Sequence, residues 1–167
     1  MELQGLSKYC GRQNYPGIVR IEYLPTKWVD GFRYESIITN AWNWQVQIPL
    51  LANRQWLTAY TLTKKNIWNE SQGGSRQGKY YDQTVNLVLP AMRPEVSGEL
   101  DSMANYRYLL KIMDRQKRNW ILGTLETPFD FTVINETGDT NGFNNYELEF
   151  NSRTPHKAYG FQPFLSP

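Results

Sequence analysis

The chain has 167 residues, with 40% hydrophobic and 14% aromatic side chains and a formal net charge of +2. This length is enough for one domain with a full core, and so small a net charge excludes the strongly basic surface typical of nucleic-acid-binding proteins. With one cysteine and one histidine, the chain cannot form an intrachain disulfide or a metal site made of several Cys or His ligands.

The sequence predicts neither a transmembrane helix nor a Sec-type signal peptide. No stretch reaches the roughly 18 apolar residues of a transmembrane helix, and the first residues lack the basic and apolar regions of a Sec-type signal peptide. The single Cys10 fits assembly in a reducing cytosol. Residues 1–16 have little periodicity and are expected to form an N-terminal arm.

Alternation of apolar and polar residues predicts β-strands in the first part of the chain. Residues 18–23 alternate in this way, and Pro25 ends the strand. Residues 28–34 fit a bent strand, and residues 56–62 alternate again.

The clearest alternation covers residues 42–48. One face of this strand would carry Trp42, Trp44, Val46 and Ile48. The other would carry three uncharged amides: Asn43, Gln45 and Gln47. Amide side chains can hydrogen-bond across an interface without the desolvation cost of a charge, so these three residues are predicted interface residues.

Residues 63–78 are polar and rich in glycine, and they are expected to form a long projecting loop or hairpin tip. They lack the Gly-Lys-Ser/Thr ending of a phosphate loop. The end of this segment is the predicted assembly loop: Gln72, Gly73, Gly74, Ser75, Arg76, Gln77 and Gly78.

The second half of the chain predicts one long strand, one helix and two hairpins. The strand carries Tyr81, Gln83, Val85, Leu87 and Leu89 on one face and ends at Pro90. Residues 94–103 predict a helix, because Pro94 and Glu95 suit its start and its apolar residues form one stripe: Val96, Leu100 and Met103.

The predicted hairpins join residues 106–112 to 120–124, and residues 129–133 to 146–150. A basic cluster at residues 115–118 falls in the first turn and is interpreted as solvated. Residues 154–167 are expected to form a C-terminal tail. Together these elements predict a single, mainly β domain over residues 1–167, an antiparallel sandwich or rolled barrel with one short inserted α-helix.

The sequence predicts no catalytic, cofactor-binding or metal-binding residue. His156 lies in a predicted loop, and no G-x-S-x-G motif provides a nucleophile. Glu147 and Glu149 alternate with apolar residues, as on a solvated strand face. A glycan hydrolase would rest only on such scattered carboxylates.

The tryptophans leave a second hypothesis open. Trp28, Trp68 and Trp120 are not all placed by the strand pattern. An exposed tryptophan can stack on a sugar ring or anchor an interface. The alternative function is therefore a carbohydrate-binding β-sandwich. Trp68 is in addition a possible interface residue.

Three features carry a resemblance to a known family: the segment 63–78 between strands, the helix 94–103 after a long strand, and the hairpin of 129–133 with 146–150. Their order resembles the tail-tube-like β modules of long-tailed bacteriophages, which include tube, terminator or completion, and distal-tail adaptor proteins. Residues 81–150 also resemble uncharacterised tail-region proteins of phages infecting Bacteroidota. Local patterns carry that second likeness: Arg93-Pro94-Glu95-Val96, Leu122-Gly123-Thr124, and Thr137-Gly138 with Asn141-Gly142.

The resemblance implies a non-catalytic virion protein of a tail or neck, assembled in the host cytoplasm. Copies of the chain would form a ring, commonly six-fold, beside other tail or neck proteins, with the segment 63–78 reaching a neighbouring ring. DNA would pass through the channel without specific binding, and no cofactor or membrane would take part. The family has no active-site residues to carry over.

Overall fold

The computed structural model describes residues 17–31, 48–62, 65–76, 78–90, 92–136 and 144–161. Its elements in chain order are β1 (Ile18–Pro25), η1 (Thr26–Trp28), β2 (Leu57–Ala59), β3 (Ile67–Ser75), β4 (Gly78–Pro90), α1 (Pro94–Met103), β5 (Tyr108–Asp114), β6 (Asn119–Leu122), β7 (Asp130–Glu136), β8 (Asn145–Thr154) and β9 (Tyr159–Phe161).

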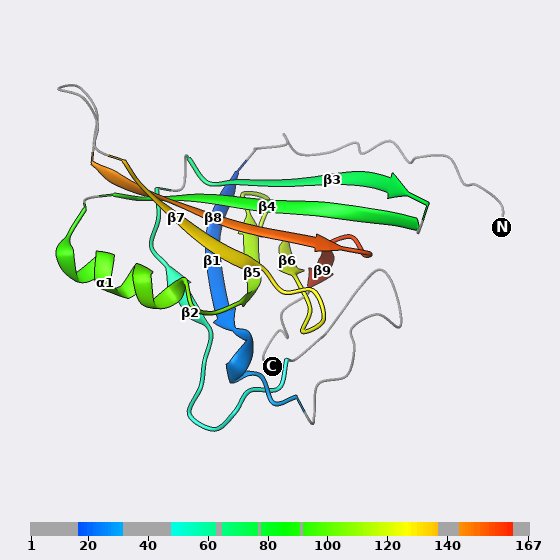
Figure 1. Ribbon diagram of the computed structural model, residues 1–167, viewed down its shortest axis with the longest axis horizontal. Helices are drawn as coiled ribbons and strands as arrows, with labels where there is room; N and C mark the ends of the chain where they lie inside the picture. The colour runs from blue at the N-terminus through cyan, green and yellow to red at the C-terminus, as the bar shows by residue number, and fades with distance from the viewer. Residues whose placement is uncertain are drawn as a thin grey trace.

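The strands form two antiparallel sheets. One has five strands in the order β2-β1-β5-β6-β9, and the other has four in the order β3-β4-β8-β7. The strands β3, β4 and β8 run across β1 and β5, so the sheets pack crossed rather than aligned (Figure 1). The predicted class, a mainly β antiparallel sandwich with one short helix, is confirmed.

The main core lies between the two sheets. Strand alternation turns Val85, Leu87 and Phe150 of the four-stranded sheet toward Leu110 and Ile112 of the five-stranded sheet, and all five are at most 1% exposed. At its centre three aromatic rings meet: Tyr108 lies 5.7 Å from Phe150 and 6.0 Å from Phe131 between ring centroids, both edge-on. The predicted inward faces of residues 81–89 and 146–150 are therefore confirmed.

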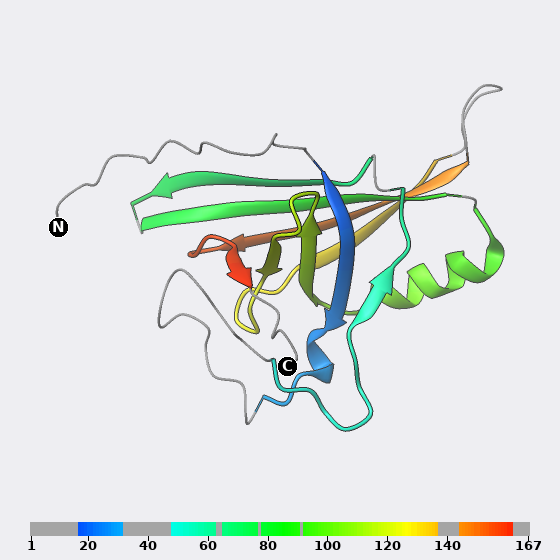
Figure 2. The ribbon, with the colours of Figure 1, turned by 180° about the vertical axis from the view of Figure 1, so that it is seen from behind.

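Helix α1 has the predicted bounds and lies beside the end of the four-stranded sheet where β4 ends (Figure 2). Arg93, at the N-cap position, forms no capping hydrogen bond with its own side chain. Instead the Tyr146 hydroxyl accepts a hydrogen bond from the Arg93 N–H (3.1 Å) and donates one to the Arg93 carbonyl (3.0 Å). At the other end the Tyr108 hydroxyl donates to the Met103 carbonyl (2.9 Å). Hydrogen bonds from two buried core tyrosines thus anchor both ends of α1, whose apolar stripe is itself weak.

A second apolar cluster covers the other face of the five-stranded sheet. It joins Leu24, Leu109 and Ile121 of the sheet to Val29 and Ile48. Four half-buried residues pack against it: Trp28, Leu50, Trp56 and Leu125. The five-stranded sheet is therefore covered on both faces.

Several expected boundaries were wrong. The strand expected at 56–62 is only the three residues of β2. Of the bent strand expected at 28–34, Trp28 ends the 3-10 turn η1 and Val29 forms an isolated bridge with Leu50, whereas residues 32–34 lie outside the described residues. The tail contains β9, which pairs with β6.

The largest correction concerns residues 63–78, because most of the expected loop is strand β3. Nine consecutive register pairs with β4 provide the hydrogen bonds that the polar sequence alone did not reveal. The arm at 1–16 and residues 42–47 lie outside the described residues.

Candidate functional site

The outer face of the four-stranded sheet carries exposed apolar side chains. Ile67 and Ile134 point outward there and are 50% and 52% exposed. Glu147 is exposed and Glu149 half-buried on the same face, as the alternation of β8 predicts. This sheet therefore buries one face and presents the other.

A groove of about 440 Å³ lies on this outer face. Val88 and Asn86 of β4 form part of its lining, with Ile67 and Ile134 on the neighbouring outer strands. Its charged lining residues are Lys65, Glu147 and Glu149. The groove is thus a mixed surface of aliphatic and charged groups.

Beside the groove, polar residues form a row across all four strands. Register places Asn69, Thr84, Asn151 and Asp130 next to one another. The Thr84 hydroxyl donates to Asn151 Oδ1 (2.9 Å), and the Asn151 amide donates to Glu149. These bonds fix side chains that an isolated strand would leave mobile.

The β3–β4 hairpin extends past the five-stranded sheet (Figure 1). Near its end residues on both faces are exposed, including Ser71, Gln72 and Lys79. Of the predicted assembly loop, residues 72–75 belong to β3, Arg76 is in the turn, Gly78 begins β4, and Gln77 is outside the described residues. The structure therefore places residues 72–76 and Gly78 at a hairpin tip rather than in an irregular loop.

The hairpin end has a specific need for glycine at position 73. An added Cβ at Gly73 would lie 2.3 Å from the ring of Tyr80, its register partner. The Arg153 guanidinium lies 4.4 Å from the centroid of that ring and donates to both Asp82 oxygens (2.6 and 3.2 Å). This hydrogen bonding to Asp82 raises the pKa of Arg153. Tyr80 thus packs over bare backbone, with an ion pair beside it.

Trp68 does not provide an exposed stacking platform. It is half-buried, packs against the main core, and meets Trp120 at 5.5 Å between ring centroids. Both indole N–H groups are buried, and neither has a hydrogen-bond partner among the described residues. The other predicted interface residues, Asn43, Gln45 and Gln47, lie outside the described residues.

A buried ion pair on the five-stranded sheet was missed by sequence reasoning. Glu22 is only 6% exposed and forms ion pairs with Arg20 and with Lys111, its register partner on β5. The Lys111 ammonium also lies 5.1 Å from the centroid of a Trp56 ring. Strand alternation assigns Glu22 to a polar face of its strand. The apolar residues around that face come from elsewhere in the chain, so the local sequence pattern did not predict that Glu22 is buried.

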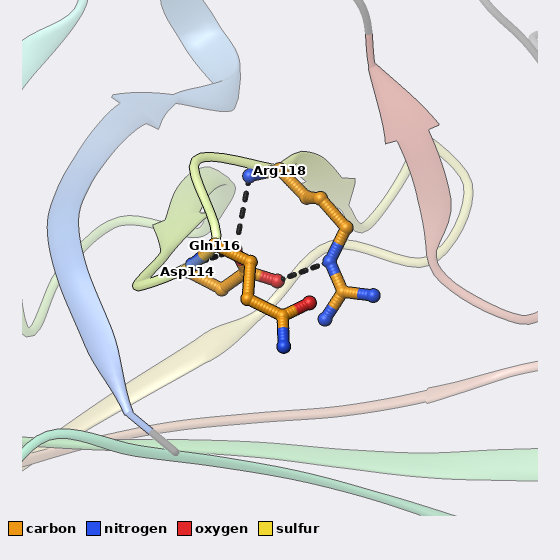
Figure 3. Close-up of polar contacts among 3 residues, drawn as sticks. All are labelled: Asp114, Gln116 and Arg118. Atoms are coloured by element: carbon orange, nitrogen blue, oxygen red, sulfur yellow. Dashed lines mark hydrogen bonds and ion pairs between the residues drawn. The ribbon is translucent and has the colours of Figure 1, made fainter. Parts of the chain in front are cut away.

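The basic cluster at 115–118 is a closed turn between β5 and β6, as predicted. The Asp114 carboxylate accepts hydrogen bonds from the N–H groups of Gln116 (2.8 Å) and Arg118 (2.9 Å) and from Arg118 Nε (2.7 Å) (Figure 3). Lys117 has a positive φ of 61°. The charge of Arg118 is thus paired with the Asp114 carboxylate within the turn.

Two tyrosines packed in the main core have shifted pKa values. Burial raises the pKa of Tyr108 and of Tyr23, and Glu99 raises that of Tyr23 further. Within the described ranges, no group of three or more His, Cys, Asp or Glu side chains is placed to hold a metal ion. Among the same residues, α1 is too short and too polar to cross a membrane.

Comparison of the chain with protein-family models, with curated proteins and with solved structures gives no match. The open sheet face and its hairpin therefore have to be interpreted from their own chemistry.

Proposed function

We propose that the protein is a non-catalytic structural subunit that associates with copies of itself. The observation that carries this proposal is the β3–β4 hairpin, which runs beyond the second sheet with residues on both faces exposed at its end. The end of this hairpin contributes little to the core of its own chain, so a contact with another chain is a role that suits it.

We further propose the setting that the sequence resemblance implies, a ring in the tail or neck of a long-tailed phage. The order of strand, helix and final hairpin supports it, and so does a groove that mixes aliphatic and charged groups. In this setting rings form through contacts between different surface patches of identical subunits.

The carbohydrate-binding alternative loses its main support. It required an exposed tryptophan, and Trp68 and Trp120 pack against the main core while Trp28 and Trp56 pack against the second cluster. No described tryptophan is classed as exposed.

The first test is the native mass by light scattering, with negative-stain images of the same sample. Rings or short tubes would support the proposal. A monomer of 19.6 kDa at every concentration would contradict self-association.

A shortened hairpin tests where the contact lies. Deleting residues 74 and 75 together with 78 and 79 removes two register pairs and leaves Gly73 and Tyr80, another hydrogen-bonded pair, flanking the same two-residue turn. We expect the fold to persist and the oligomer to weaken. Arg115→Ala, in the other hairpin turn, is the matched control and is expected to leave the mass unchanged.

A further inference from the structure

The outer edge of β3 has the properties of a strand that pairs with another chain. β3 is the end strand of its sheet and pairs with β4 over nine residues without a register shift. It contains no proline, lysine or arginine, which are the residues that commonly protect such edges. Its one charge, Glu70, is held by the Gln83 amide (2.8 Å) and the Ala158 N–H (2.7 Å).

The other sheet edges are less suited to pairing. β2 and β9 have three residues each, and short edge strands offer few hydrogen bonds. β7 has seven residues but begins and ends with an acidic residue. β3 is therefore the longest of the four edge strands and the least protected.

The turn identifies which backbone groups of β3 point outward. Two residues separate Ser75 from Gly78, so this pair is a hydrogen-bonded pair of the hairpin. Alternation then directs the N–H and C=O groups of four residues away from β4: Trp68, Glu70, Gln72 and Gly74. Among the described residues, no backbone hydrogen bond outside the β3–β4 ladder reaches these four.

An independent bond supports this assignment. The Leu62 N–H donates to the Val88 carbonyl (2.8 Å), on the stretch of β4 beyond its last pair with β3, Ile67 with Asn86. The even-numbered residues of β4 therefore face the β3 side, as the turn requires.

We propose that this edge pairs with the same edge of a second copy, antiparallel and centred on Ser71. In this register all nine residues of β3 overlap, Glu70 faces Gln72 of the second copy, and Trp68 faces Gly74 of the second copy. The four outward-facing residues of one copy then lie opposite the outward-facing residues of the second copy. Each such pair is a hydrogen-bonded pair with two hydrogen bonds. The result joins two four-stranded sheets into one continuous sheet.

Neighbouring registers are less favourable. Moving the centre to Glu70 sets the two Glu70 carboxylates opposite each other, and like charges in that position are destabilising. Moving it to Gln72 shortens the overlap and leaves Glu70 facing Gly74. The position of one charge thus selects the register.

The contact rests on the self-association proposed above but not on the phage setting. In the proposed register the two copies of Ser71 form a non-hydrogen-bonded pair, with Cα atoms about 4.5 Å apart, within the range that a disulfide spans. In a Cys10→Ser background, Ser71→Cys is therefore expected to give a disulfide-linked dimer on mild oxidation. Asn69→Cys is the matched control, because it lies four residues out of register, about 13 Å from its copy.

The outcomes separate the two proposals. Rapid cross-linking of Ser71→Cys alone would support the contact. Equal cross-linking of both variants, or an oligomeric wild type that Ser71→Cys does not cross-link, would overturn the register while leaving self-association intact. A monomeric wild type with no cross-link would overturn both.

A charge exchange gives a second readout without a new covalent bond. Gln72→Glu places a glutamate opposite Glu70 at two symmetric positions of the dimer, so it should raise the dimer Kd by about two- to thirtyfold. Gln72→Lys places a lysine opposite Glu70 instead and should lower the Kd. Asn105→Glu and Asn105→Lys, at an exposed site after α1, should change neither. The same response to both charges at Gln72 would contradict the proposed pairing with Glu70.

Discussion

The two sheets are built from similar strands but differ in what covers them. The five-stranded sheet is buried on both faces, so that even its carboxylate Glu22 is 6% exposed. The four-stranded sheet buries one face and leaves Ile67 and Ile134 half exposed on the other. The five-stranded sheet thus acts as a scaffold, and the four-stranded sheet presents a surface. Mutations in the scaffold should change stability, whereas mutations on the presented surface should change association.

Truncation at the shared core should have the largest effect on stability. Phe150 is 1% exposed and contacts the rings of Tyr108 and Phe131. Phe150→Ala removes this packing and leaves a cavity, so we expect a loss of about 3–5 kcal/mol in the free energy of unfolding. Urea denaturation measures it. A loss below about 1 kcal/mol would mean that the two sheets do not share this core.

Removing the buried carboxylate should be nearly as costly. Glu22→Ala removes the carboxylate that forms ion pairs with both Arg20 and Lys111 on a covered face, and we expect a loss of about 3 kcal/mol in the free energy of unfolding. The matched variant is Asp82→Ala, which breaks an exposed ion pair with Arg153 on the other sheet and should cost much less because solvent screens it. Equal losses by urea denaturation would remove the contrast between the sheets.

The sequence was sufficient where structure depends on neighbouring residues. Alternation correctly oriented Val85, Leu87, Leu148 and Phe150, and the proline and apolar stripe correctly bounded α1. These signals arise within a few residues of chain, which is the range over which a sequence pattern has direct physical meaning.

The sequence was insufficient where structure depends on distant partners. The polar, glycine-containing β3 becomes a strand because β4 pairs with all of it, and Glu22 is buried because distant segments cover its face. The same limit applies to the candidate site. The described residues of the predicted assembly loop, 72–76 and Gly78, lie at a hairpin tip, but only the register with β4 shows which backbone groups of β3 point outward.

The buried tyrosines should make stability fall in alkaline solution. Burial raises the pKa of Tyr108 and Tyr23 above the ordinary value of 10.0. The unfolded chain therefore loses these protons first, and the stabilisation present below about pH 10 is lost as the pH rises through the folded pKa values. Urea denaturation at pH 8 and pH values above 10 measures this dependence.

Tyrosine substitutions identify the source of that dependence. Tyr108→Phe should flatten it, whereas Tyr60→Phe should not, because Tyr60 is 85% exposed. An unchanged slope in Tyr108→Phe would assign the alkaline loss to other groups.

Two adjacent glycines should differ at the hairpin. Gly73→Ala forces the Tyr80 ring to move, whereas a Cβ at Gly74 meets nothing within 4 Å. We expect a loss of about 1 kcal/mol for Gly73→Ala and little change for Gly74→Ala, measured by urea denaturation. Equal values would show that Tyr80 does not pack on the backbone of Gly73.

The smallest effect is expected on the open face. Ile134 is 52% exposed beside the groove, so Ile134→Ser removes little buried area and should change the free energy of unfolding by no more than about 0.5 kcal/mol. Its consequence should appear instead in native mass, if the groove belongs to a contact between subunits. A loss above about 1.5 kcal/mol in the monomer would show that the face is covered within one chain, and the distinction between scaffold and presented surface would no longer hold.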